Sequence, residues 1–284
     1  MHLKYSIWSS YFVDLSPEAM VDEFAAAGYS VTEFSDEHGA MLLRRAAERG
    51  VSPAAAGAEL KAYAEAKGVS FPQGHLYLAV DLCAPDAAET LTPWLDLFVS
   101  LGIRAAVLHP SCKQEGLTAE ERFGRWIKTL TALTDPLAGT EMSIALENAG
   151  GIALSAEALL SIIDAVGSEH LGICLDTGHL HLHRAKGRID AETTQSGFIR
   201  RAGDRLIALH IADNDTSGDE HLMPFGGGTV DFRDVMRGLR EVGYDGLFNL
   251  EIPGERRAPL EVRRAKLAYL HTVCRCMLGE EFVR

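Results

Sequence analysis

The sequence predicts an α/β fold in which one domain spans residues 1–284 and forms a closed (β/α)8 barrel. Short runs of β-type residues alternate with Ala- and Leu-rich stretches of helical period, and the chain contains eight such runs. Strands that alternate with helices require right-handed crossovers and a parallel sheet. Eight units in 284 residues match the repeat number of a closed barrel. An open doubly wound sheet is the alternative, but no GxGxxG motif follows the first strand.

Local signals set the expected element boundaries. Capping residues mark helix starts, and glycines mark helix ends just before the next strand. The capping residues are Ser16, Ser52, Asp86, Thr118 and Ser155, and the closing glycines are Gly28, Gly68, Gly102, Gly167 and Gly243. The expected strands comprise residues 4–7, 30–34, 69–76, 105–108, 143–146, 172–175, 206–211 and 246–250, with about eight helices between them.

Composition restricts the partners of the chain. With 47% hydrophobic residues it can bury a full core, and 27 basic against 40 acidic residues give a formal charge of −13. A surface this acidic repels phosphate backbones, so nucleic acid is disfavoured as a partner. The five cysteines form no CxxC pair, no signal-peptide pattern is present, and no apolar run approaches the roughly 20 residues of a membrane helix. We expect a cytoplasmic protein without membrane contact, and leave homo-oligomerisation through the barrel helices open.

Ionisable residues lie at the carboxyl ends of the predicted strands, where barrel enzymes place their reactive groups. From the second strand to the eighth, these residues are Glu33, His75, His109, Glu147, Asp176, His210 and Glu251. One such residue taken alone is an ordinary loop-facing polar group. Six consecutive strands that end this way, from the third to the eighth, direct six side chains toward one cavity.

This crowding points to a metal ion. Closely packed carboxylates repel one another, and one of them stays protonated unless a cation holds them. Glu147, Asp176, His210 and Glu251 form a mixed oxygen and nitrogen set suited to a divalent metal ion: Mn2+, Zn2+, Co2+ or Mg2+. One ion is expected.

Further imidazoles and a carboxylate extend this set. The additional candidates for metal or substrate binding are His75, His109, His179, Asp219 and His221. With them a second or third ion becomes feasible, and their imidazoles favour zinc. His181 and His183 are interpreted as ordinary polar positions, and Gly226-Gly227-Gly228 is weak evidence for phosphate binding.

Four sequence blocks carry a resemblance to a known family. They read ALEN at Glu147, CLDTGH at Asp176, HIADN…DEHLMPFGGGTVDF from His210, and NLEIPGE at Glu251. With these blocks the chain resembles the xylose isomerase-like TIM barrel superfamily of sugar (phosphate) isomerases and epimerases, which also contains the type IV AP endonucleases. The resemblance covers nearly the whole chain and implies the same fold.

The two branches of that superfamily imply different sites. In the ketose 3-epimerase branch four strand-end residues hold one divalent metal, which here implies Glu147, Asp176, His210 and Glu251, with the two glutamates as the acid/base pair. The endonuclease branch holds three zinc ions. Its ligand positions correspond here to His75, His109, Glu147, Asp176, His179, His210, Asp219, His221 and Glu251.

The expected function is isomerisation or epimerisation of a small-molecule sugar substrate by proton transfer through a metal-stabilised enediolate. Glu147 and Glu251 are the predicted acid and base, and His179 orients or polarises a substrate oxygen. Trp8 is interpreted first as a core residue, with an apolar wall for the sugar as the alternative. The epimerase branch usually carries an arginine shortly after the strand-seven histidine, whereas here residues 211–214 read IADN.

Other activities stay open at this point. They are a three-zinc phosphodiesterase acting on abasic DNA, a keto-inositol-type dehydratase, and a sugar-binding barrel without activity. The negative net charge argues against the first of these, because a DNA-binding barrel needs a basic rim. The identity of the sugar, the metal, and the choice between proton transfer and hydride shift are open as well.

Overall fold

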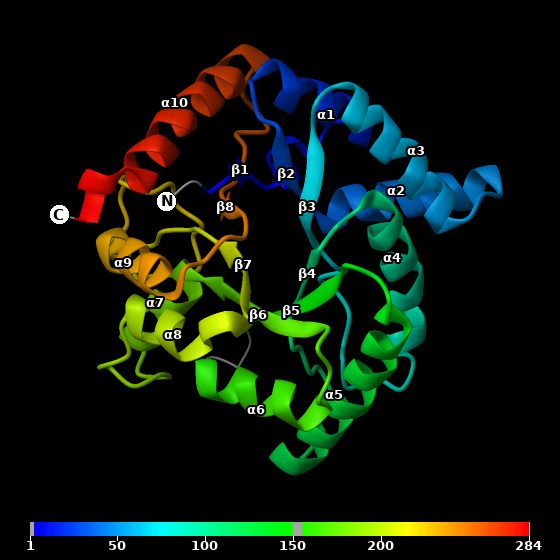
Figure 1. Ribbon diagram of the computed structural model, residues 1–284, viewed down its shortest axis with the longest axis vertical. Coiled ribbons are helices and arrows are strands. Elements are labelled where there is room, and N and C mark those ends of the chain that lie inside the picture. Colours follow the sequence, from blue (N-terminus) through cyan, green and yellow to red (C-terminus); the bar gives the residue numbers. More distant parts are fainter. Residues whose placement is uncertain (1–2, 150–154, 284) are drawn as a thin grey trace.

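The computed structural model describes residues 3–149 and 155–283 and shows a ring of strands surrounded by helices (Figure 1). The strands are β1 (Tyr5–Ile7), β2 (Val31–Phe34), β3 (Ser70–His75), β4 (Ala105–Leu108), β5 (Ser143–Glu147), β6 (Leu171–Asp176), β7 (Leu206–His210) and β8 (Phe248–Leu250). All eight predicted strands are present, and their ends differ from the prediction by at most two residues. The α/β barrel prediction is confirmed.

The ring is closed by parallel pairing and by two weaker seams. Strands β2 to β7 pair in sequence order, and β1 pairs with β8. Between β7 and β8 the connection is a bridge between Ile211 and Leu250. Between β1 and β2 the Thr32 hydroxyl donates a hydrogen bond to the Ile7 carbonyl oxygen at 2.7 Å. A closed ring brings the carboxyl ends of all the strands to one mouth.

The described residues contain ten α-helices rather than about eight, because two units carry a second helix. The helices are α1 (Pro17–Ala26), α2 (Asp36–Arg49), α3 (Pro53–Ala66), α4 (Ala87–Leu101), α5 (Ala119–Thr134), α6 (Ala156–Val166), α7 (Thr177–Ala185), α8 (Gln195–Ala202), α9 (Phe232–Val242) and α10 (Leu260–Leu278). Gly50 ends α2 with φ +66°, and the Ser52 cap then starts α3. The Asp176 carboxylate caps α7 directly after β6. None of these helices is long and apolar enough to cross a membrane.

Most predicted helix caps are confirmed. The side chains of Ser16, Ser52, Thr118 and Ser155 each accept a hydrogen bond from a backbone N–H in the first helical turn. Asp86 precedes α4, but its side chain accepts no capping hydrogen bond from the described residues. Its backbone (φ −99°, ψ 6°) lacks the extended conformation of the other caps, which aims a side chain at the helix N-terminus. Asp86 therefore has the predicted position before the helix, but the prediction that its side chain caps the helix is wrong.

Small residues fill the barrel interior beneath the mouth. Val107, Ala145, Cys174 and Ala208 form a buried cluster with Ala105 that is separate from the large core between sheet and helices. Side chains two apart on a strand point the same way. Ala145, Cys174 and Ala208 therefore lie one layer below Glu147, Asp176 and His210, which the strands direct toward the mouth.

Candidate metal centre

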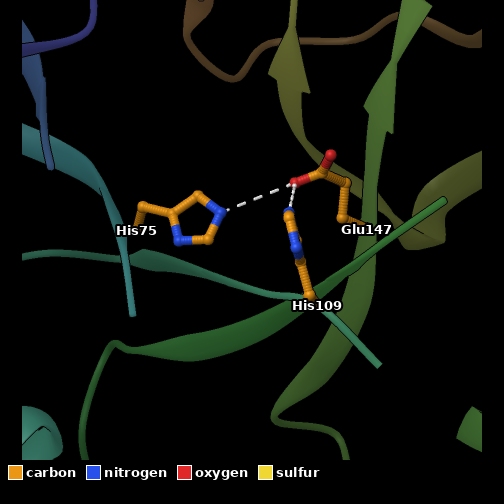
Figure 2. Close-up of side chains that lie close together, drawn as sticks. All are labelled: His75, His109 and Glu147. Carbon is orange, nitrogen blue, oxygen red and sulfur yellow. Dashed lines mark hydrogen bonds and ion pairs between the residues drawn. The ribbon is translucent and has the colours of Figure 1, made fainter. Parts of the chain in front are cut away.

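Glu147, the last residue of β5, lies at the centre of the predicted site. Its carboxylate is 1% exposed and approaches four imidazoles. The Oε2 atom lies 3.0 Å from His109 Nε2, 3.2 Å from His210 Nδ1 and 3.7 Å from His75 Nε2. The Oε1 atom lies 2.9 Å from His179 Nδ1. Figure 2 shows His75, from β3, and His109, which follows β4, both directed at the Glu147 carboxylate.

His210 and Glu251 complete the central group. His210 ends β7, and its Nδ1 atom lies 3.1 Å from Glu251 Oε2 as well as 3.2 Å from Glu147 Oε2. The two carboxylates therefore flank one imidazole nitrogen from opposite parts of the ring, since β5 and β8 are not neighbours. Asp176 joins from β6, with its Oδ1 atom 3.8 Å from His179 Nδ1.

A second group lies at the rim, where Asp219 and His221 from the loop after β7 meet His179 from α7. His179 Nε2 lies 3.0 Å from Asp219 Oδ2, and His221 Nε2 lies 3.4 Å from Asp219 Oδ1. The backbone of His221 has φ +48°, a left-handed conformation that residues other than glycine rarely adopt. Such residues cluster at functional sites. The structure thus brings all nine predicted residues to one mouth of the barrel.

Unsatisfied polar atoms show that this donor set fits a cation. Six buried side-chain atoms of the predicted ligands make no hydrogen bond to any described residue: His75 Nε2, Glu147 Oε1, Asp176 Oδ2, His179 Nδ1, His210 Nδ1 and Glu251 Oε2. A buried polar atom without a partner costs about 1–3 kcal/mol, so six at one place require an explanation. Several donor groups here have atoms within 4.8 Å of one another, among them His75–His109–Glu147, Glu147–Asp176–His179, His179–Asp219–His221 and Glu147–Cys174–His210. A divalent cation with nitrogen and oxygen ligands would satisfy them.

Backbone carbonyls fix the tautomers of two of the histidines. His75 Nδ1 lies 2.7 Å from the Leu76 carbonyl oxygen, and His221 Nδ1 lies 3.0 Å from the Glu251 carbonyl oxygen. A carbonyl only accepts, so each Nδ1 carries a proton, and Nε2 is the nitrogen of each ring that a cation would bind in place of a proton.

A buried chain of side chains fixes His210 in the opposite tautomer. The Ser6 hydroxyl donates to Asn249 Oδ1 at 2.8 Å, and Asn249 Nδ2 donates to Glu33 Oε2. Glu33 Oε1 accepts from His210 Nε2 at 2.9 Å. All four residues are completely buried. Nε2 therefore keeps its proton, and Nδ1, between Glu147 and Glu251, is the nitrogen that a cation would bind in place of a proton.

Sequence reasoning did not find this chain. It placed Glu33 at a strand end but gave it no role, and it did not single out Ser6 or Asn249. Strand alternation is the available signal for Asn249, because that residue lies two positions before Glu251 and faces the same side of β8. The hydrogen-bond pairing across the ring follows only from the closed barrel.

The carboxylates titrate differently within the site. Burial would raise the pKa of Glu147, but the charges of His109 and His210 hold it well below the usual range. Burial likewise opposes ionisation of Glu251, yet His210 lowers its pKa to about 2. Burial raises the pKa of Asp176 to about 7; Glu147 and Glu251 add to this shift, whereas His179 opposes it. Asp176 thus resists ionisation in the absence of a cation, first because it is buried and then because of the repulsion between carboxylates that the sequence analysis expects.

Two further predictions concern residues near the mouth. Trp8 is half-buried rather than a fully buried core residue; its ring stacks on that of His221 at 6.3 Å between centroids, and its indole N–H donates to the Ile252 carbonyl oxygen. His181 contacts the Thr229 hydroxyl at 2.8 Å, and His183 Nδ1 lies 3.5 Å from the Arg188 guanidinium, as ordinary polar residues would.

The segment after His210 has a structural role. Asp213 is buried, and its Oδ1 atom accepts from the backbone N–H groups of Asn214 and Val230 at 2.9 Å each. A Cβ atom on Gly228 would lie 2.2 Å from this carboxylate, so the glycine run serves packing at this point. A cavity of about 610 Å³ opens at the opposite end of the strands, near Lys4 and Arg104, and its lining includes none of the nine residues.

Comparison with known proteins assigns the chain to a family. Residues 21–272 match the family described as the xylose isomerase-like TIM barrel. The chain belongs to this family. The resemblance inferred from ALEN, CLDTGH and NLEIPGE is therefore correct.

Relatives in the xylose isomerase-like family include both branches considered above. The chain is 25% identical over 210 residues to D-psicose 3-epimerase of Enterocloster bolteae, covering 68% of this chain and 65% of that protein. It is 32% identical over 165 residues to a probable endonuclease 4 of Bacillus licheniformis, covering 56% of this chain and 52% of that protein. The chain spans between 41% and 65% of the length of these and two uncharacterised curated relatives.

Solved structures agree on the fold. D-psicose 3-epimerase from Clostridium cellulolyticum H10, determined with D-tagatose, superposes with a TM-score of 0.76 at 16% identity, covering 98% of this chain and 100% of that one. At this identity the likeness establishes the barrel architecture and nothing about the substrate.

Proposed function

We propose that this protein is a divalent-metal-dependent isomerase or epimerase acting on a sugar or a sugar-derived keto compound. The observation that carries the proposal is the placement of Glu147 and Glu251, which flank His210 Nδ1 at 3.2 and 3.1 Å and both favour the ionised state. Two carboxylates that reach one point from separate strands suit proton removal and proton return at one carbon. The similarity to D-psicose 3-epimerase supports a sugar as the substrate.

The proposed metal ligands are Glu147, Asp176, His210 and Glu251, with Mn2+, Zn2+, Co2+ or Mg2+ as candidate ions. When bound, such a cation supplies Lewis-acid chemistry that stabilises negative charge on the substrate oxygens. His75, His109, Asp219 and His221 offer positions for additional ions or for substrate contacts.

Separate residues of the chain would transfer the proton, orient the substrate and line the mouth. One ionised glutamate accepts the proton from the carbon beside the substrate carbonyl. The other takes up a proton from solvent and returns it to the opposite face of the same carbon. The His179 imidazole, which lies between the carboxylates of Glu147 and Asp219, would orient or polarise a substrate oxygen. Trp8, stacked on His221, provides an apolar wall beside the mouth.

The test is conversion of a ketose panel, including keto-inositols, by metal-loaded protein in deuterated water. We expect a product epimer or isomer that carries deuterium at the reacting carbon, because the proton passes through a carboxyl group that exchanges with solvent. Glu147→Gln and Glu251→Gln should each reduce kcat by roughly 100-fold or more, as expected for loss of a general acid or base. Product without deuterium would indicate a hydride shift and contradict proton transfer, whereas loss of water would indicate a dehydratase.

One observation favours a second candidate, a three-zinc phosphodiesterase acting on abasic DNA. The groups His75–His109–Glu147 and His179–Asp219–His221 are both assembled, although a one-metal epimerase needs neither. The net charge of −13 opposes this activity, because phosphate binding requires basic contacts. Cleavage of an abasic duplex, together with three zinc ions per chain by elemental analysis, would favour the phosphodiesterase. One ion per chain without cleavage would favour the epimerase.

A further inference from the structure

A second cluster of potential metal donors, one carboxylate and two thiols, lies on the loops that follow β3 and β4. Asp81 and Cys83 belong to the first loop and Cys112 to the second. One carboxylate oxygen of Asp81 and the sulfur atoms of the two cysteines lie within 4.8 Å of one another. The cluster shares no residue with the nine of the candidate metal centre.

The backbone around this cluster is fixed by hydrogen bonds between the two loops. The Ser111 hydroxyl donates to the Val80 carbonyl oxygen at 2.5 Å, and the Gln114 side-chain amide donates to the Cys83 carbonyl oxygen at 3.2 Å. Within the first loop, Asp81 Oδ1 accepts from the Cys83 backbone N–H at 3.0 Å. The three donors are thus held together before any ligand arrives, which lowers the entropic cost of binding.

The chemistry of the donors selects the ligand. Thiolates are soft ligands that favour zinc over magnesium, calcium or manganese, and a carboxylate oxygen is a common partner in zinc sites. Donors about 2.0–2.3 Å from a tetrahedral zinc lie roughly 3.3–3.8 Å from one another. The three donors of this cluster lie within 4.8 Å of one another, so binding would draw them together by about 1 Å. We propose that Asp81, Cys83 and Cys112 bind a thiophilic divalent cation such as Zn2+, with water in the fourth position.

Such an ion would brace the mouth of the barrel. It would join the loop that begins after His75 to the loop that begins at His109, and both histidines contact Glu147 (Figure 2). Burial, followed by the neighbouring Cys112 thiol, raises the pKa of Cys83 to about 12. Binding must therefore displace thiol protons, and the affinity for the cation should rise with pH.

Cobalt binding to the reduced full-length protein tests the proposal, because thiolate-to-cobalt charge transfer gives a near-ultraviolet absorption that imidazole and carboxylate ligands lack. We expect this absorption in the unmodified protein and its loss by about half or more in both Cys83→Ser and Cys112→Ser. Asp81→Asn should keep the absorption, because both thiolates remain. It should weaken cobalt binding at least about tenfold, since loss of a residue that only supports a ligand already lowers metal affinity by about that factor. Because Asp81 and Cys112 are only partly buried, these variants test the site even if Cys83→Ser fails to fold.

Two cysteines serve as controls. Cys276→Ser removes an exposed thiol and should leave the absorption unchanged, and Cys174→Ser removes a buried thiol beside the candidate metal centre. Absorption that persists in Cys112→Ser but disappears in Cys174→Ser would overturn the proposal. Equal alkylation of Cys112 in zinc-loaded and zinc-free protein would also overturn it, since a thiolate bound to zinc is protected.

Discussion

Glu33 shows how one buried carboxylate can set the chemistry of a neighbouring residue. It accepts hydrogen bonds from Asn249 and from His210 Nε2, so both of its oxygens are occupied and it acts only as an acceptor. The imidazole is held in one orientation with Nδ1 directed at Glu147 and Glu251. Partners of this kind tune metal ligands without touching the ion.

The Glu33→Gln variant should therefore bind metal more weakly. In glutamine an NH2 group replaces one of the two carboxylate oxygens and faces a donor, either Asn249 Nδ2 or His210 Nε2, so one of these hydrogen bonds is lost. We expect the affinity for the divalent ion to fall about 10–100-fold, measured by competition with a chelator dye. Glu37→Gln is the matched control, because Glu37 contacts the Ser10 hydroxyl rather than His210. Equal affinities of Glu33→Gln and the parent protein would contradict the positioning role.

At the scale of elements, the helix caps offer a paired test. Thr118 forms a capping box with Glu121 at the start of α5, whereas Asp86 makes no capping hydrogen bond at the start of α4. Thr118→Ala should lower the free energy of unfolding by about 1 kcal/mol, and Asp86→Ala by clearly less. Urea denaturation of both variants measures the difference. A loss at Asp86 as large as at Thr118 would show that the hydrogen bond is not the source of the stabilisation.

The same elements show what a sequence can specify. Strand runs, glycine stops and serine or threonine caps depend on nearby residues, and these predictions are correct within two residues for every strand. The candidate ligands at the strand ends, such as Glu147 and Asp176, also follow from local pattern, because each ends its own strand. The Ser6–Asn249–Glu33 chain joins residues from three strands at opposite ends of the sequence. The stacking of Trp8 on His221 likewise depends on a loop conformation that no periodicity encodes.

At the scale of the whole molecule, a buried histidine links stability to pH. His38 is completely buried; its Nδ1 atom lies 2.9 Å from the Ser9 hydroxyl and 3.1 Å from the Ser35 hydroxyl. Burial lowers the pKa of His38 to about 4, whereas the unfolded chain has the ordinary value near 6.5. The unfolded state then binds a proton first, so stability is full above about pH 6.5 and is lost as the pH falls toward 4.

The pH dependence of unfolding should report this residue. Between about pH 7.5 and 5.5 the parent protein should lose roughly 1 kcal/mol more of its free energy of unfolding than His38→Asn, which cannot take up this proton. Denaturant unfolding of both metal-free proteins across this range measures the slopes, and the metal-site histidines contribute equally to each. Parallel slopes would show that His38 does not titrate in this range.

Asp176 has two duties that different substitutions can separate. One of its oxygens accepts the His179 backbone N–H at 2.6 Å and starts α7, while the other is left without a hydrogen bond among the described residues. Asparagine preserves the hydrogen bond that starts α7 but lacks the negative charge needed to bind an ion. Alanine removes both the hydrogen bond and the charge. Asp176→Asn should lose ion binding yet retain the far-ultraviolet circular dichroism of the parent, whereas Asp176→Ala should also unwind the turn that presents His179. The start of α7 and the proposed ion site thus depend on the same carboxyl group.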